Sequence, residues 1–252
     1  MKKAKYFLSA MLMAACFTQP ATAQFEGSIT YKSQDYSNSD DENDDSFTLF
    51  LTPERIMLQG EKEYNFMESI NTEGVLVRLD QEDFVFLTGD DRALKITKTD
   101  ITSLMNLFGN GQEASQKAEE MDITQKRTGE TKTIQDYEAE KFIFKDKDGD
   151  DNKRFVVWMT QDIDVNWGML AEPWENDADK LISSSDFPVD LIFKEKYFPL
   201  RFESYENDEL ESVLEATEVN KTAIDQAKVE VPSGVAVLSM QNYLFQKMSE
   251  NQ

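Results

Sequence analysis

The sequence predicts a mainly β (α+β) protein with a single, strongly curved antiparallel sheet, a half-barrel with a few helices packed on its concave face. Two observations support this. Most of the chain divides into short runs of alternating apolar and polar residues separated by polar turns, which is typical of strands. Only a few segments show helical spacing, and neither a Gly/Ser- or Pro-rich linker nor a repeat divides the chain. We therefore expect one domain over residues 24–252.

The composition excludes several classes of function. Hydrophobic residues make up 40% of the 252 residues, which is enough for a core. The 49 acidic and 26 basic residues give a net charge of −23, which disfavours nucleic acid and anionic membranes as partners. The absence of His excludes imidazole-based catalytic triads and His-ligated metals. We therefore expect no catalytic, cofactor-binding or metal-binding residues of these kinds.

Residues 1–23 have the three parts of a secretory signal peptide. Lys2, Lys3 and Lys5 precede an apolar run at residues 6–17, which is too short to span a bilayer. Small residues at 21–23 then provide a cleavage site. We expect export by the Sec route, cleavage after Ala23, and a periplasmic or extracellular location. The alternative is a lipobox at residues 13–16, which would leave a lipid-anchored outer-membrane form starting at Cys16, the only cysteine.

Six strand-like runs with turn signals between them occupy the first part of the expected mature chain. They predict an antiparallel meander over residues 25–32, 47–51, 55–58, 75–79, 84–87 and 93–97. A helix is expected next, because apolar residues recur with a spacing of three and four. Its stripe consists of Ile101, Leu104, Met105 and Phe108, with Thr99 or Asp100 as the cap and Gly109 at the end.

A second set of strands is expected in the rest of the chain. It covers residues 128–133, 137–145 and 154–159, and then a hairpin of 198–204 and 211–219 around Asn207 and Asp208. Residues 161–190 are less regular. The stretch from Ser239 has the spacing of a short amphipathic helix.

Four short motifs, in this order, resemble the secreted Bacteroidota family called domain of unknown function 4412 (DUF4412). They are residues 25–31, residues 128–134 leading to Tyr137 and then Lys141-Phe142, residues 157–160 followed by Asp162, and residues 231–234. The sequence departs from the family pattern at Asp136, where Gly is expected, and at Val235, where Tyr is common. The resemblance implies a remote likeness to LolA, the lipoprotein carrier, whose half-barrel covers helices over an apolar cavity. It implies no catalytic residues.

Two acidic segments could hold calcium through carboxylate oxygens, and each has a simpler interpretation. Residues 40–45 contain five acids, but they lack a recognisable ligand spacing and suit a solvated hairpin loop. Residues 146–150 resemble the start of an EF-hand loop. The sixth and twelfth positions are Asp151 and Val157, where that loop needs Gly and Glu. Asp148-Gly149 instead fits a type I′ hairpin turn.

Large apolar residues provide the candidate binding site. Trp167, Met169 and Leu170 lie in the irregular stretch and, with the 101–108 stripe, could line a cavity or form ordinary core. We expect a non-enzymatic, exported binder of a lipid or acyl chain, with no cofactor. One alternative is an envelope interaction or structural module with a filled core, and another is a hydrolase that uses only carboxylates. No protein partner can be named from the sequence.

Overall fold

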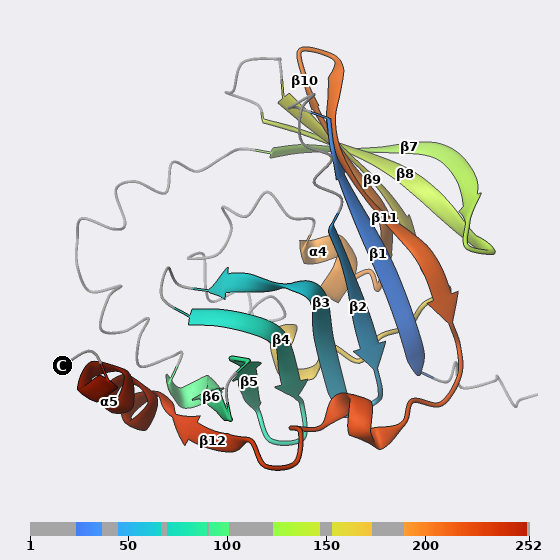
Figure 1. Ribbon diagram of the computed structural model, residues 1–252. Helices are drawn as coiled ribbons and strands as arrows, with labels where there is room; N and C mark the ends of the chain where they lie inside the picture. Colours follow the sequence, from blue (N-terminus) through green and yellow to red (C-terminus); the bar gives the residue numbers. More distant parts are fainter. Residues whose placement is uncertain are drawn as a thin grey trace, which may run out of the picture.

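The computed structural model of the protein describes residues 24–36, 45–66, 70–89, 91–100, 123–146, 153–172 and 189–250. These residues form one 12-stranded sheet, which curls into an open half-barrel (Figure 1). The strands are β1 (Gly27–Asp35), β2 (Asp45–Leu51), β3 (Arg55–Phe66), β4 (Ile70–Arg78), β5 (Asp83–Leu87), β6 (Arg92–Thr97), β7 (Ile123–Ile134), β8 (Tyr137–Asp146), β9 (Lys153–Thr160), β10 (Phe198–Glu206), β11 (Glu209–Asn220) and β12 (Ala236–Ser239). The predicted fold class is confirmed.

Two meanders, β1 to β6 and β7 to β11, make up the sheet. Its strand order is β12-β6-β5-β4-β3-β2-β1-β11-β10-β9-β8-β7, so the meanders meet where β1 pairs with β11. We call this pairing the seam. At the seam Ser28 lies opposite Asn220, and a Cβ on Gly27 would lie 2.0 Å from the Asn220 carbonyl oxygen. Gly27 therefore allows a backbone approach that a larger residue would block.

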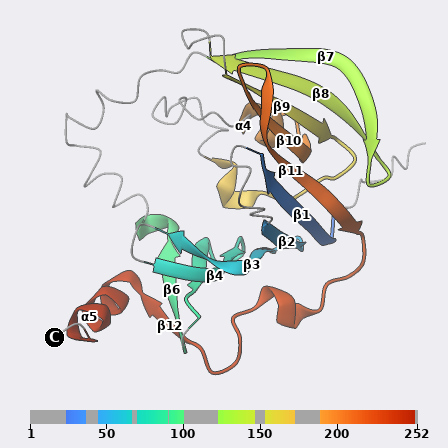
Figure 2. The same ribbon diagram turned by 45° about the horizontal axis from the view of Figure 1, so that its top comes forward.

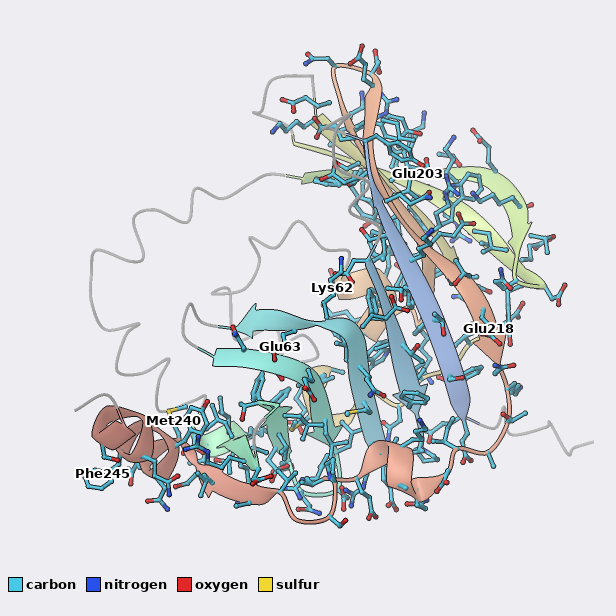
Figure 3. The ribbon with its side chains drawn as sticks, in the orientation of Figure 1. Lys62, Glu63, Glu203, Glu218, Met240 and Phe245 are labelled. Atoms are coloured by element: carbon cyan, nitrogen blue, oxygen red, sulfur yellow. The ribbon has the colours of Figure 1, made fainter. Side chains whose placement is uncertain are left out.

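The expected strands agree with the observed ones, except where polar residues extend them. β3 continues through Glu61, Lys62 and Glu63 to Phe66, well beyond the apolar run that ends at Leu58. The three charged side chains are exposed; Lys62 and Glu63 project from this extension in Figure 3. An exposed ribbon needs no apolar alternation, so the pattern in the sequence ends before the hydrogen bonding does.

The C-terminal segment returns to the far edge of the sheet. After β11 the chain passes through the 3₁₀ helix η3 (Gln226–Val229), whose Val229 packs on Met57, Leu76 and Val85. β12 then pairs with β6 in parallel, unlike the expected antiparallel arrangement. Between β11 and β12 the chain crosses from the seam to the far edge of the sheet (Figure 2). β12 therefore does not follow β6 through a hairpin, which would have made the pair antiparallel.

Helix α5 (Met240–Glu250) confirms the amphipathic helix expected from Ser239. Its Tyr243 is 3% exposed and packs with Phe86, Leu94 and Ile96. Phe245 points away from the sheet and is 76% exposed (Figure 3). The helix is thus attached to the sheet by one side only.

The helix expected at 101–108 lies outside the described residues, whereas residues 98–100 just before it are described and helical. The predicted cap at Thr99 or Asp100 is wrong. The Thr97 hydroxyl accepts a hydrogen bond from the Asp100 backbone N–H at 3.1 Å, and the Asp100 carboxylate accepts one from the Thr97 N–H at 2.9 Å. This reciprocal pair is a capping box, whose partners are three positions apart with two residues between them.

Candidate functional site

The concave face of the sheet carries a continuous row of apolar side chains over seven neighbouring strands. Each residue lies directly opposite the next in the strand register: Val219, Ile29, Leu49, Leu58, Val75, Phe86 and Leu94. We call this the inner row. It lies two residues along each strand from a second row of Leu51, Ile56, Val77, Phe84 and Ile96. The period of two along a strand puts both rows on the same face.

The two rows differ in burial at the middle of the sheet, although Ile29, Phe86 and Leu94 of the inner row are also buried. Leu51, Ile56 and Val77 in the second row are 1%, 5% and 7% exposed. Leu49, Leu58 and Val75 at the middle of the inner row are only half-buried. The concave face is therefore closed along one end and less completely covered beyond it.

The closed end is covered by the segment that follows β9. Asn166 donates from Nδ2 to the Pro53 carbonyl at 2.6 Å, and its side-chain oxygen accepts from the Gly168 N–H at 3.1 Å. Gly168 begins the 3₁₀ helix η1 (Gly168–Leu170) with a φ of 45°. A Cβ there would lie 3.1 Å from the Leu79 side chain. These contacts fix the segment across the sheet.

The predicted site residues of this segment come together. The Trp167 ring stacks on Phe198 at 6.2 Å and meets Phe193, at the end of helix α4 (Val189–Phe193), edge-on at 5.6 Å. Met169 is 7% exposed within the main core, and Leu170 packs against the same core. Trp167 stays half-buried at the border of the covered region. The other four predicted residues, Ile101, Leu104, Met105 and Phe108, lie outside the described residues.

Helix α4 covers the other half of the concave face and was not expected from the sequence. Its Leu191 and Ile192 are 1% and 2% exposed and pack in a cluster with Phe142 and Val157 of the second meander. Figure 1 shows α4 inside the curl of the sheet. With five residues, the helix is too short for its periodicity to be recognised in the sequence.

A buried tyrosine joins the two meanders beneath the inner row. The Tyr31 ring stacks on Phe47 at 5.1 Å, and its hydroxyl donates to the Pro199 carbonyl at 2.6 Å. Burial raises the pKa of Tyr31 well above its ordinary value, because the interior disfavours a phenolate. The hydroxyl therefore stays protonated and donates its hydrogen bond from β1 past β11 to β10.

The opposite face of the second meander carries charges. Arg201 donates from Nε to the Glu203 carboxylate at 2.6 Å and also pairs with Glu215. Glu203, labelled in Figure 3, is 9% exposed and accepts a second bond from the Tyr205 hydroxyl at 2.9 Å. Because the carboxylate has donors at both oxygens, the cost of burying it is compensated.

A lysine lies beside this charged cluster. The Lys132 ammonium is 4.1 Å from the centroid of the Trp158 ring, which is 9% exposed. Burial, and then the nearby positive charge of Arg201, lower the pKa of Lys132. The ring face attracts the cation and offsets part of this cost.

A cleft of about 420 Å³, with charged residues in its lining, lies at the end of the sheet where β1 begins and β11 ends. Its lining comes from four separate parts of the chain: Phe25, Gln161, Asp162, Asp164, Glu195, Lys196 and Lys221. This cleft could not be predicted from the sequence, because its charged residues lie in separate connecting segments.

Most residues of the two predicted calcium loops, 40–44 and 147–151, lie outside the described residues. β8 and β9, on either side of the second loop, form an antiparallel pair. Within the described ranges no group of three or more acidic, His or Cys residues is placed to hold a metal ion. A search of the same ranges finds no helix with the length and apolar character needed to cross a membrane.

Comparison with known proteins gives one family match. The family described as domain of unknown function (DUF4412) matches residues 89–235, whereas no curated protein matches. Among solved structures, PNGF-II is 15% identical with a TM-score of 0.43 over 88% of this chain. The chain spans 32% of the length of PNGF-II.

Two other solved structures are similar to the chain. MucB in complex with MucA(peri) is 11% identical, with a TM-score of 0.41 over 93% of this chain and 62% of that one. A LolA superfamily protein from Nitrosomonas europaea is 10% identical, with a TM-score of 0.28 over 83% of this chain and 91% of that one.

Proposed function

The chain belongs to the DUF4412 family, and from this premise and the inner row we propose that it is an exported, non-enzymatic protein that binds a lipid or acyl chain on the concave face of its sheet. The observation that supports the proposal most directly is the partial exposure of Leu49, Leu58 and Val75 at the middle of an otherwise continuous apolar row. A partly exposed apolar strip of this kind gains free energy when an apolar ligand covers it.

The size of this gain is sufficient for specific binding. Burying one methylene group contributes about 0.8 kcal/mol, and micromolar affinity requires about 8 kcal/mol. An acyl chain of about twelve carbons would therefore bind even after part of the gain is lost to ordering. No charged group is needed on the concave face itself.

The predicted site residues extend this proposal. Trp167 lies at the border of the covered region, and Ile101, Leu104, Met105 and Phe108 are proposed to line the ligand from the other side. Met105 and Met169 suit such a site because thioether side chains adapt to ligands of variable shape.

The test compares two adjacent positions of β3. The exported protein is titrated with a fluorescent fatty-acid probe, and organic extracts are examined by mass spectrometry. Leu58 faces inward and is half-buried, whereas Gln59 faces outward and is exposed. We expect Leu58→Glu to weaken probe binding at least tenfold, because the charge would be desolvated by the probe. Gln59→Glu adds the same charge on the opposite face and should leave binding unchanged.

Absence of probe binding and of lipid would favour the alternative, a structural module. The tightly packed closed end, with Ile163 and Leu200 at 1% and 0% exposure, is what a filled core would show. If the folded wild type binds no probe saturably and its extracts contain no lipid, the carrier function is wrong and the module with a filled core replaces it. Intact mass of the same sample tests the expected start at Gln24.

A further inference from the structure

The cleft at the start of β1 has charges of both signs in a small, formed space. We propose that it binds a small zwitterion, a molecule with one ammonium group and one carboxylate or phosphate group. This site goes beyond the proposed function, because its lining residues belong to none of the apolar rows on the concave face.

Hydrogen bonds hold the walls of the cleft together without a ligand. The Phe25 N–H donates to the Asp164 carbonyl at 2.7 Å, which attaches the residues just before β1 to the segment after β9. Gln161 donates from Nε2 to the Glu195 carbonyl at 2.9 Å, which attaches that segment to the turn before β10. A cleft whose walls are already fixed loses little free energy to ordering when a ligand binds.

The charges divide into an internal pair and a set that faces the space. Lys196 Nζ lies 3.6 Å from Asp164 Oδ1, so these two neutralise each other. Asp162 and Lys221 also line the cleft, and the described residues form no salt bridge with either, whereas the charge of Glu195 also acts on Arg127. The cleft therefore offers the Asp162 carboxylate to an ammonium group and the Lys221 ammonium to an anionic group.

The size and the overall charge restrict the ligand further. A volume of about 420 Å³ is within the range of small-molecule sites and is too small for a folded partner. The net charge of −23 repels a simple anion at long range, whereas a zwitterion is not repelled. The buried Phe25 contributes an apolar surface to the lining, which suits the short carbon chain between the two charged groups.

The experiment uses isothermal titration calorimetry on the exported protein. The zwitterions are glycine, 4-aminobutyrate and phosphoethanolamine, and the single-charge controls are ethylamine, acetate and inorganic phosphate. At least one zwitterion should bind at least tenfold more tightly than every single-charge control. Lysophosphatidylethanolamine, below its micellar concentration, distinguishes a lipid headgroup from a free small molecule.

Variants assign the binding to the cleft. Lys221→Glu and Asp162→Asn should each weaken zwitterion binding about tenfold, which corresponds to about 1.4 kcal/mol for one charge-assisted contact. Both positions are exposed, so folding should be unaffected, and thermal melting checks this. Lys126→Glu, at an exposed position of β7 outside the cleft, makes the same charge change and should leave binding unchanged.

Three outcomes would overturn the inference. In the first, ethylamine binds as well as every zwitterion. In the second, Lys221→Glu and Lys126→Glu behave alike. In the third, only the lysolipid binds and Leu58→Glu abolishes that binding, which places the ligand on the concave face and leaves the proposed function intact. Conversely, zwitterion binding that survives Leu58→Glu supports the cleft even if the acyl-chain proposal fails.

Discussion

Tyr31 is the residue whose substitution tests the joining of the two meanders most directly. Tyr31→Phe keeps the ring stacked on Phe47 but removes the hydrogen bond to the Pro199 carbonyl. A lost buried hydrogen bond with an unsatisfied acceptor costs about 1–3 kcal/mol. We expect the free energy of unfolding at pH 7 to fall by this amount. Tyr36→Phe removes the hydroxyl of a 53% exposed tyrosine and should change stability by less than about 0.5 kcal/mol.

The same variant should alter the response to alkaline pH. Burial raises the pKa of Tyr31 in the folded state above its ordinary value of 10.0. The unfolded chain then releases this proton first, so the contribution of Tyr31 to stability is complete below pH 10 and is lost as the pH rises above it. At pH 11 this loss is about 1.4 kcal/mol in the wild type and zero in Tyr31→Phe. The stability deficit of the variant should therefore shrink by that amount.

The measurement is urea unfolding at several pH values from 7 to 11, followed by circular dichroism. Burial also raises the pKa of Tyr137, Tyr197 and Tyr205, but these three contribute equally to both proteins and cancel in the difference. A difference between wild type and variant that stays constant from pH 7 to pH 11 would refute the assignment of a buried, protonated Tyr31.

Two further substitutions test the backbone of the sheet by the same unfolding assay. Gly27→Ala places a Cβ 2.0 Å from the Asn220 carbonyl oxygen and should lower the free energy of unfolding by about 1–3 kcal/mol, because it forces the seam apart. The neighbouring Ser28→Ala should cost less. Equal losses of stability in the two variants would contradict the close approach of the two backbones at Gly27. Asp136→Gly should raise stability by about 0.5 kcal/mol, because Gly adopts the φ of 67° without strain. Asp208→Gly, at a φ of 65°, should gain less because it removes the ion pair with Arg154, and a larger gain there would contradict this account.

The sequence predicted the strands well because each has to bury one face. In β10, Phe198, Leu200 and Phe202 alternate with residues of other character, and this period was sufficient to place the strand. The departure from the family pattern at Asp136 also has a structural explanation. Gln135 and Asp136 both have positive φ, as a type I′ turn requires, and Gly is the residue that adopts this conformation most easily.

The order of the strands could not be predicted from the same pattern. Alternation shows that a strand has an apolar face, but it does not identify the neighbour that covers it. The seam pairs β1 with β11, which are far apart in the chain, and the parallel pairing of β12 depends on a crossover of mostly exposed residues that is attached to the sheet by Val229. Helix α4 was missed for a related reason, since Leu191 and Ile192 are too few to establish a period.

Of the two candidate sites, the one formed by residues close together in the sequence could be predicted, and the one formed by distant segments could not. Trp167 and Met169 were predicted because large apolar residues in an irregular stretch are visible in the sequence. The cleft was missed because Asp162, Glu195 and Lys221 belong to three different connections, and only the closed seam brings these connections to one end of the sheet.

The seam therefore has two consequences. It joins two meanders into one apolar concave face, and it gathers the polar ends of their strands beside the first residues of the expected mature chain. A substitution that opens the seam, such as Gly27→Ala, should for this reason disturb the cleft before it disturbs the middle of the inner row.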